Sequence, residues 1–310
     1  MSGLAVFGPT ASGKTQLSLR IAEELDVEII SADSRQVFRG LDIGTAKVPS
    51  EIRRCVPHHG IDICEPHESF DTGRFRRYAE TVMAEIKERR KLPFIVGGTG
   101  LYLSALLKDF LDDEIGPGMD AEIKAYHNRI MSRRRAGEAD ALFTELEHVD
   151  PDSARKYHDK NPRRVDRALL YYHTHGLPFS VAHRTRSMKA HTDIAVFVIE
   201  RDRDELNERI ARRVNEMWDQ GLEDEVRRLL DDGIPRHAQS LATVGYREML
   251  EYLDGRLTRA QALEATVVAT RRYAKRQRTW ARHQFPDARV LRGDDDEMMR
   301  NVMMIVKQPT

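Results

Sequence analysis

Short apolar runs of strand length recur along the chain, and segments with helical periodicity lie between them. The runs are Leu4–Phe7, Glu28–Ser31, Phe94–Val96, Ile194–Ile199 and Ala288–Leu291. Helical patterns follow the first run, at Thr15–Leu25, and precede the third, at Thr72–Arg90. Strands that alternate with helices at this spacing form βαβ units. The pattern therefore predicts an α/β fold with a parallel sheet flanked by helices on both faces.

The pattern changes between residues 112 and 191, where no strand run occurs and the helical segments are short and basic. Strand character resumes in the run at Ile194. A long amphipathic helix follows it, with apolar residues at helical spacing at Leu206, Ile210, Val214 and Trp218. Another helix is predicted at Thr258–Arg282, before the last run and a Met-rich tail. We therefore predict a helical insertion domain at 112–191 within a core made of residues 1–111 and 192–310.

Composition narrows the class of protein. The 310 residues are 40% hydrophobic and 32% charged, and the formal net charge is zero. Affinity for a polyanion must therefore come from local clusters of basic residues. The two cysteines, Cys55 and Cys64, imply no disulfide framework, and no apolar run reaches the roughly 18 residues that cross a bilayer. We expect a cytoplasmic protein, monomeric and without a membrane partner.

One motif carries specific chemistry. The first apolar run leads directly into Gly8-Pro9-Thr10-Ala11-Ser12-Gly13-Lys14-Thr15, which matches the G-x-x-x-x-G-K-[ST] pattern of a phosphate-binding loop (P-loop) and precedes a helical segment. The glycines let backbone N–H groups converge on phosphate oxygens, and the helix adds the positive end of its dipole. Lys14 supplies a positive charge, and the Thr15 hydroxyl is suited to ligate Mg²⁺. The motif predicts a P-loop NTPase-like fold that binds ATP or another di- or triphosphate.

The carboxylate that an ordinary NTPase carries after a later strand is missing. The run at Phe94–Val96 continues into Gly97-Gly98-Thr99-Gly100, and the acidic residue instead follows the second run, as Asp33. At the end of a strand, Asp33 could be a metal ligand, a general base or a helix cap, and Thr99 could likewise be only a helix cap. The arrangement favours a bound diphosphate with chemistry other than phosphoryl transfer.

Several blocks occur in a fixed order along nearly the whole chain. They are GPTASGKT at Gly8–Thr15, SADSRQVFRGLDIGTAK at Ser31–Lys47, PHHGIDICEP at Pro57–Pro66, FDTGRFRRYA at Phe70–Ala79, PFIVGGTGLYLSALL at Pro93–Leu107 and TVGYRE at Thr243–Glu248. In this order and spacing, the blocks resemble the tRNA dimethylallyltransferase family. The resemblance implies transfer of a dimethylallyl group from dimethylallyl diphosphate to N6 of the adenosine at tRNA position 37. It also implies Mg²⁺ as cofactor and the tRNA anticodon stem-loop as partner.

For the donor, the resemblance implies that the P-loop holds the diphosphate, with Mg²⁺ at Thr15. Arg213 would neutralise the charge that develops on the leaving group. Arg209 and Arg212 lie in the same helical stretch, so a merely solvated charged face remains the alternative for Arg213.

For the acceptor, the resemblance implies that Asp33 accepts a proton from the adenine N6 and that Thr99 donates to the bridging oxygen of the leaving group. Contacts to tRNA are implied for three segments, namely Asp33, Ser34, Arg35 and Gln36; Arg163, Arg164, Val165, Asp166 and Arg167; and Ala242, Thr243, Val244, Gly245, Tyr246 and Arg247. Many relatives carry Gln in place of Arg163 and Arg in place of Ala242. These departures concern single base contacts and not the type of reaction.

The helix predicted near the end of the chain is strongly basic. Between Thr270 and Phe285 it contains no acid and carries Arg271, Arg272, Lys275, Arg276, Arg278 and Arg282. This clustering is typical of a surface that binds an RNA backbone, with a solvated charged face as the alternative. Tyr273 and Trp280 could stack on bases, but their helical spacing favours a role as core anchors.

Other functions remain open at this point. A P-loop small-molecule kinase is one, an RNA-binding protein with an inactive P-loop is another, and an adenylate isopentenyltransferase acting on free nucleotides is a third. A group of possible zinc ligands, Cys55, His58, His59, Cys64 and His67, has a spacing that fits no standard structural zinc site. Mg²⁺ is therefore the expected metal.

Overall fold

The chain forms two compact units in the structure, a computed structural model that describes residues 2–111, 121–186 and 189–307. The sheet unit comprises Met1–Leu107 and His191–Thr310, and the helical unit comprises Lys108–Ala190. The predicted start of the insertion, residue 112, lies outside the described residues. No helix in the described part of the chain is both long and apolar enough to cross a membrane.

Within the described residues, the sheet unit contains a six-stranded parallel sheet with the strand order β3-β2-β4-β1-β5-β6. The strands are β1 (Gly3–Phe7), β2 (Val27–Ala32), β3 (His58–His59), β4 (Leu92–Gly97), β5 (Ile194–Ile199) and β6 (Arg289–Leu291). The central strand β1 pairs with β4 and β5, and β4 also pairs with β2. The predicted parallel α/β fold is confirmed. The short edge strand β3 was not predicted, because it lies in a stretch rich in glycine and proline that reads as a loop.

Alternate residues of β1 supply the cores on the two faces of the sheet. Ala5 and Phe7 belong to the larger core, whereas Leu4 and Val6 belong to the smaller one. Successive side chains of a strand point to opposite faces, so a strand covered on both faces is apolar throughout. The larger core is covered by α3 (Thr72–Glu88), α4 (Gly100–Leu107), α10 (Arg203–Asp219), α11 (Leu222–Asp231), α12 (Tyr246–Leu253) and α13 (Arg259–Gln284).

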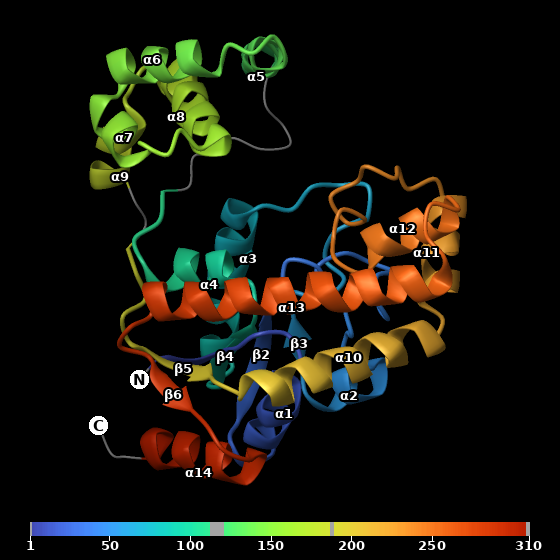
Figure 1. Cartoon of the computed structure of the whole chain (residues 1–310). Coiled ribbons are helices and arrows are strands. Elements are labelled where there is room, and N and C mark those ends of the chain that lie inside the picture. Colours follow the sequence, from blue (N-terminus) through green and yellow to red (C-terminus); the bar gives the residue numbers. More distant parts are fainter. Residues whose placement is uncertain (1, 112–120, 187–188, 308–310) are drawn as a thin grey trace. The chain divides into compact units, whose positions relative to one another are not determined.

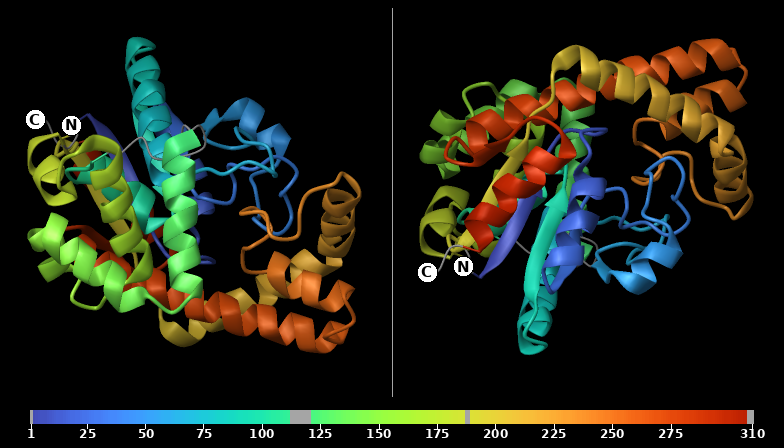
Figure 2. Two further views of the ribbon diagram at one scale, coloured as in Figure 1. Left: turned by 90° about the horizontal axis from the view of Figure 1, so that it is seen from above. Right: turned by 90° about the horizontal axis from the view of Figure 1, so that it is seen from below.

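The smaller core lies under α1 (Lys14–Glu24) and α14 (Asp295–Val306), which pack against each other on one face of the sheet (Figure 2). The Met-rich tail noted in the sequence is thus a helix, and it buries Met298, Met299 and Val302 in this core. The short helix α2 (Ser50–Cys55) has no buried residue.

Two long helices of the larger core, α10 and α13, lie side by side across the sheet unit (Figure 1). Leu206, Ile210, Val214 and Trp218 of α10 are all buried, as their spacing predicts. This pair of helices forms one wall of the cavity described below.

The helical unit consists of α5 (Ala121–Arg135), α6 (Ala139–Val149), α7 (Pro151–Lys156), α8 (Pro162–His175) and α9 (Phe179–Thr185). It has its own apolar core, which includes Leu142, Leu146 and Leu169. The buried carboxylate of Asp150 accepts hydrogen bonds from the backbone N–H groups of Ser153 (3.1 Å) and Ser180 (2.9 Å), and so joins the starts of α7 and α9. Its core and these bonds make the unit a compact body in its own right.

Candidate active site

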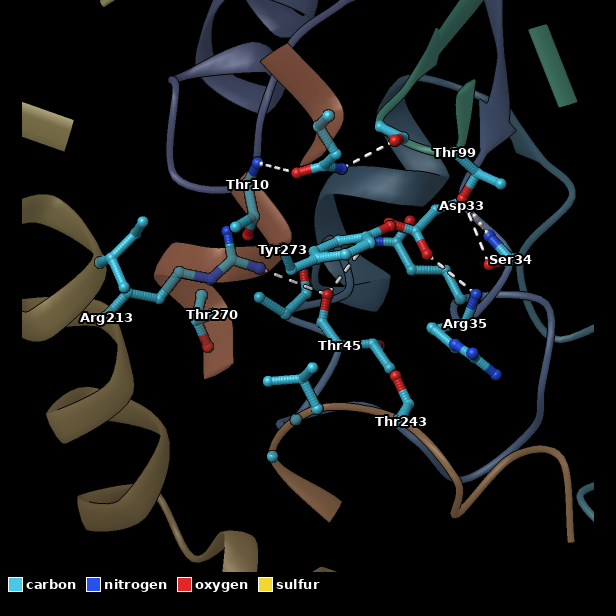
Figure 3. Close-up of a pocket in the computed structure, with 18 of the residues that line it drawn as sticks. Thr10, Asp33, Ser34, Arg35, Thr45, Thr99, Arg213, Thr243, Thr270 and Tyr273 are labelled. Carbon is cyan, nitrogen blue, oxygen red and sulfur yellow. Dashed lines mark hydrogen bonds between the residues drawn. The ribbon is translucent and has the colours of Figure 1, made fainter. Parts of the chain in front are cut away.

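Three segments that are distant in the sequence meet at the carboxyl edge of the sheet. The P-loop follows β1, Asp33 follows β2 and Thr99 follows β4, and these strands are neighbours in the order β2-β4-β1. Together with α10 and α13, they line a cavity of about 530 Å³ (Figure 3). Open α/β sheets bind their ligands at this edge. The parallel topology therefore brings together the residues that the motifs single out.

The P-loop is held in shape from its outer side. Gly13 has a φ of +96° and Ala11 a φ of +62°, both in the left-handed region. A side chain at Gly13 would be strained, and its Cβ would lie 3.3 Å from Nη2 of Arg201. Arg201 donates to the carbonyl oxygen of Ser12 (3.1 Å), and Arg209 donates to that of Ala11 (2.9 Å). These bonds occupy carbonyl oxygens that would otherwise repel an anion.

Two cations, Lys14 and Arg213, line the cavity. Lys14 donates to the carbonyl oxygen of Pro9 (2.9 Å) at the base of the P-loop. Burial and, to a smaller extent, the positive charge of Arg213 lower the pKa of Lys14, and Asp33 opposes them, with a net result of about 8. Burial also lowers the pKa of Arg213. Each cation is destabilised by poor solvation and by the other, so the site favours an anionic ligand.

Among Arg209, Arg212 and Arg213 of α10, Arg213 is the one that lines the main cavity. It extends from α10 toward the centre of the cavity (Figure 3), where its Nη2 lies 3.5 Å from the carbonyl oxygen of Thr45. Arg209 is bound to the P-loop backbone, as described above. Arg212 is exposed and lines a smaller hollow of about 320 Å³ on the outer side of the P-loop. The geometry separates three residues that the sequence left equivalent.

Asp33 and Thr99 lie on the side of the cavity opposite Arg213 (Figure 3). The Asp33 carboxylate accepts a hydrogen bond from the backbone N–H of Arg35 (2.8 Å), so Asp33 caps a turn while it lines the cavity. The Thr99 hydroxyl accepts from the backbone N–H of Ser34 (2.9 Å) and lies 3.2 Å from the Ser34 hydroxyl. The Thr99 side chain therefore binds across to the Asp33 segment.

Two of the expected tRNA segments also line this cavity. The first segment contributes Ser34, Arg35 and Gln36 to the cavity lining. The second contributes Ala242, Thr243, Val244, Gly245 and Arg247. Arg35 ties the two together, because its Nη1 donates to the carbonyl oxygen of Gln239 (2.8 Å).

Tyr246 does not face the cavity, which corrects the expectation that it contacts tRNA. Its side chain is fully buried, and its hydroxyl donates to the Glu225 carboxylate (2.5 Å). Glu225 is also buried, and it accepts from the backbone N–H groups of Asp42 (2.8 Å) and Ile43 (2.7 Å). Tyr246 and Glu225 thus support the loop that presents Thr45 to the cavity. As one of several acids in a charged helix, Glu225 gave no signal of this role in the sequence.

The third expected segment lies in α8 of the helical unit. Arg163, Arg164 and Arg167 are exposed there. Val165 is 1% exposed and packs in the core of the unit, and Asp166 forms an ion pair with Arg134. Burial rules out direct contact of the Val165 side chain with tRNA, which corrects that expectation as well.

Gln277 of α13 was missed in the sequence, and it lines the cavity together with Tyr273 and Trp280, which were expected to be core anchors. Trp280 packs against Phe7, with 5.8 Å between ring centroids, as expected of a core anchor. Uncharged residues that recur at helical spacing within a basic helix were the available signal. Of the basic residues, Arg271, Arg272, Lys275 and Arg282 are exposed, and Arg276 reaches the cavity.

The possible zinc ligands bind other partners. His59 lies 2.7 Å from the Glu28 carboxylate, and the buried Cys64 thiol lies 3.3 Å from the Glu68 carboxylate. Across residues 2–111, 121–186 and 189–307, no three His, Cys, Asp or Glu side chains converge as a metal site would require.

Comparison with known proteins gives the family. The sequence model of the family described as IPP transferase matches residues 36–284. The tRNA dimethylallyltransferase of Anoxybacillus flavithermus is 41% identical over 283 residues, which cover 91% of this chain and 88% of the relative. That of Bacillus subtilis is 42% identical over 277 residues, covering 89% and 86% of the two chains. This chain belongs to the IPP transferase family.

Solved structures agree with this assignment. The tRNA isopentenylpyrophosphate transferase of Bacillus halodurans is 37% identical, with a TM-score of 0.69. The match covers 99% of this chain and 96% of the Bacillus halodurans chain. The structure of a eukaryotic dimethylallyltransferase, described as acting on tRNA, has a TM-score of 0.84 at 25% identity. The match covers 99% of this chain and 80% of the eukaryotic one. The predicted family is confirmed by both kinds of comparison.

Proposed function

We propose that this IPP transferase moves a dimethylallyl group from dimethylallyl diphosphate to N6 of the adenosine at position 37 of tRNA. The observation that carries the proposal is one cavity in which an anion-binding P-loop faces a carboxylate. The curated relatives are named tRNA dimethylallyltransferases, which supports both the donor and the acceptor. In the reaction, the N6 lone pair forms a bond to the allylic carbon, and the carbon–oxygen bond to the diphosphate breaks. The diphosphate leaves with that electron pair, and the N6 proton is taken up by a base.

The donor's diphosphate would lie between Lys14 and Arg213. Both side chains face the cavity and lack a carboxylate partner bonded to them among the described residues. Two buried cations stabilise a leaving group on which negative charge accumulates, and they do so with little reorganisation. The same pair would bind the ground state more weakly, because the charge there is less concentrated on the bridging oxygen.

Mg²⁺ would be held by the Thr15 hydroxyl and by oxygens of the diphosphate. Thr15 fits this role because it is exposed in the first turn of α1 and lines the cavity beside Lys14. Mg²⁺ prefers such hydroxyl and phosphate oxygens over nitrogen or sulfur ligands. When bound, the ion would supply further neutralisation of the leaving group.

Asp33 would serve as the base for N6. One carboxylate oxygen is engaged by the Arg35 N–H, and no donor is placed on the other among the described residues. Thr99 would donate its hydroxyl hydrogen to the bridging oxygen of the diphosphate, since its own oxygen already accepts from Ser34. Asp33 and Thr99 lie near each other in the cavity, as an attacking amine and a departing oxygen on the same carbon require.

The tRNA would present its adenosine flipped out of the anticodon loop, which costs only a few kcal/mol for a base that is not paired. The cavity mouth formed by Arg35 and the 242–247 loop would receive it. Exposed cations of α13, together with Arg163, Arg164 and Arg167, would bind the RNA backbone. All residues that line the cavity belong to one sheet unit, which supports a monomer as the active form, and a tRNA substrate supports action in the cytoplasm.

The decisive experiment is incubation of the protein with labelled dimethylallyl diphosphate, Mg²⁺ and unmodified tRNA, with AMP and ATP as competing acceptors. We expect label in the tRNA, at the adenosine next to the anticodon. Label in AMP and not in tRNA would instead support an adenylate isopentenyltransferase. Release of phosphate from ATP would support a kinase.

A further inference from the structure

One face of α13 lies along the Gly98-Thr99-Gly100 loop. Gln277 donates from Nε2 to the carbonyl oxygen of Gly98 (2.7 Å). Tyr273, one turn earlier, lines the same cavity as Thr99. Trp280, nearly one turn later, packs against Gly100. Positions four and three residues apart on a helix form a single stripe, so these contacts come from one rigid surface.

Gln277 also reaches the P-loop. Its Oε1 accepts from the backbone N–H of Thr10 (2.9 Å), a bond marked by the dashed line at Thr10 in Figure 3. The side chain is 6% exposed, so both of its hydrogen bonds are shielded from water. A single primary amide therefore bridges the diphosphate loop and the residue before Thr99.

The glycines on either side of Thr99 show how closely α13 approaches. A Cβ at Gly98 would lie 2.4 Å from Nε2 of Gln277, and a Cβ at Gly100 would lie 2.3 Å from the Trp280 ring. Neither position tolerates a side chain without displacing α13 or the loop. The close approach leaves the Thr99 hydroxyl little freedom to change its distance from the P-loop.

We propose that Gln277 is a positioning residue for the transfer reaction, and that its amide sets the distance between the P-loop and the Thr99 hydroxyl. This inference rests on the proposed function, in which the P-loop holds the diphosphate and Thr99 donates to its bridging oxygen. Glutamine is suited to the task because one side accepts and the other donates. The Gln277 side chain does not need to touch the substrate to act.

The test is a double-mutant cycle on steady-state prenyl transfer to tRNA. Gln277→Met keeps the length of the side chain and removes both hydrogen bonds, so we expect kcat to fall about tenfold or more. Binding of inorganic diphosphate, measured by calorimetry, should change by less than about threefold, because the P-loop and Lys14 remain. In a Thr99→Ala background, Gln277→Met should lower kcat by about twofold or less, since there is no hydroxyl left to place.

Two further variants complete the design. Gln277→Glu keeps the length of the side chain and the acceptor for Thr10 but removes the donor to Gly98. It should lower kcat several-fold with Thr99 present and leave it unchanged in Thr99→Ala, so this variant tests the inference if Gln277→Met does not fold. Gln220→Met makes the same exchange as Gln277→Met at an exposed position and should match the wild type. An unaltered kcat in Gln277→Met and Gln277→Glu, or equal losses with and without the Thr99 hydroxyl, would overturn the inference. Absence of prenyl transfer by the wild type would instead count against the proposed function.

Discussion

The lowered pKa of Lys14 predicts how diphosphate binding depends on pH. Burial and the charge of Arg213 bring this pKa to about 8 in the free protein. A bound diphosphate would raise it again, because it favours the ammonium form. Binding above pH 8 must therefore be accompanied by uptake of a proton, and affinity must fall as the pH rises. Between pH 7 and pH 9 the protonated fraction of Lys14 falls about tenfold, so the dissociation constant should rise about tenfold.

Isothermal calorimetry with dimethylallyl diphosphate at pH 7, 8 and 9, in buffers of different ionisation enthalpy, measures both the affinity and the proton uptake. Lys14→Arg is the matched control, since a guanidinium stays charged throughout this range. We expect the control to bind more weakly at pH 7 but to lose the pH dependence that belongs to Lys14. The same rise in dissociation constant in Lys14→Arg would refute the reasoning, because the titrating group would then lie elsewhere.

Three further substitutions test separate parts of the site. Asp33→Asn should lower kcat by about 10²-fold or more while diphosphate binding survives, and unchanged turnover would remove Asp33 from the role of base. Arg213→Gln should lower kcat about tenfold or more and also raise KM for dimethylallyl diphosphate, because the lost charge stabilises the leaving group most in the transition state, whereas Arg203→Gln, at an exposed position on the same helix, should change neither. Tyr246→Phe should cost about 1 kcal/mol of unfolding free energy in urea titration, because it leaves the buried Glu225 carboxylate with one partner fewer. Its affinity for tRNA should equal that of the wild type, and a clear loss without destabilisation would restore Tyr246 as a tRNA contact.

The parts of the site that could be predicted from the sequence are those set by local chain geometry. The P-loop is contiguous, so its residue types and spacing specify its shape. Asp33 and Thr99 lie far apart in the sequence, yet each follows an apolar run, and the carboxyl ends of parallel strands meet at one edge of the sheet. Pattern and topology together were enough to place them near the P-loop.

The parts that could not be predicted depend on contacts between distant residues. Gln277 forms a hydrogen bond with Thr10, which lies 267 positions away in the sequence, and no sequence pattern near either residue predicts this contact. On α13 the many exposed cations dominate the sequence and conceal the uncharged stripe that faces the cavity. Glu225 is equally hidden, since a charged residue in a charged helix reads as solvated until the backbone N–H groups of Asp42 and Ile43 are seen on its carboxylate.

The structure also explains why the carboxylate of this site stands after β2 and not after β4. A Cβ at Gly97, the last residue of β4, would lie 2.1 Å from the carbonyl oxygen of Ala32, and a Cβ at Gly98 would meet Gln277. Neither of these two positions beside the P-loop accepts an acidic side chain, which phosphoryl transfer from a nucleotide would need there to orient metal and water. Close packing of β4 against β2 and α13 therefore excludes a carboxylate from these two positions. In the function proposed here, Asp33, one strand further from the P-loop, is the carboxylate that receives the proton of the incoming amine.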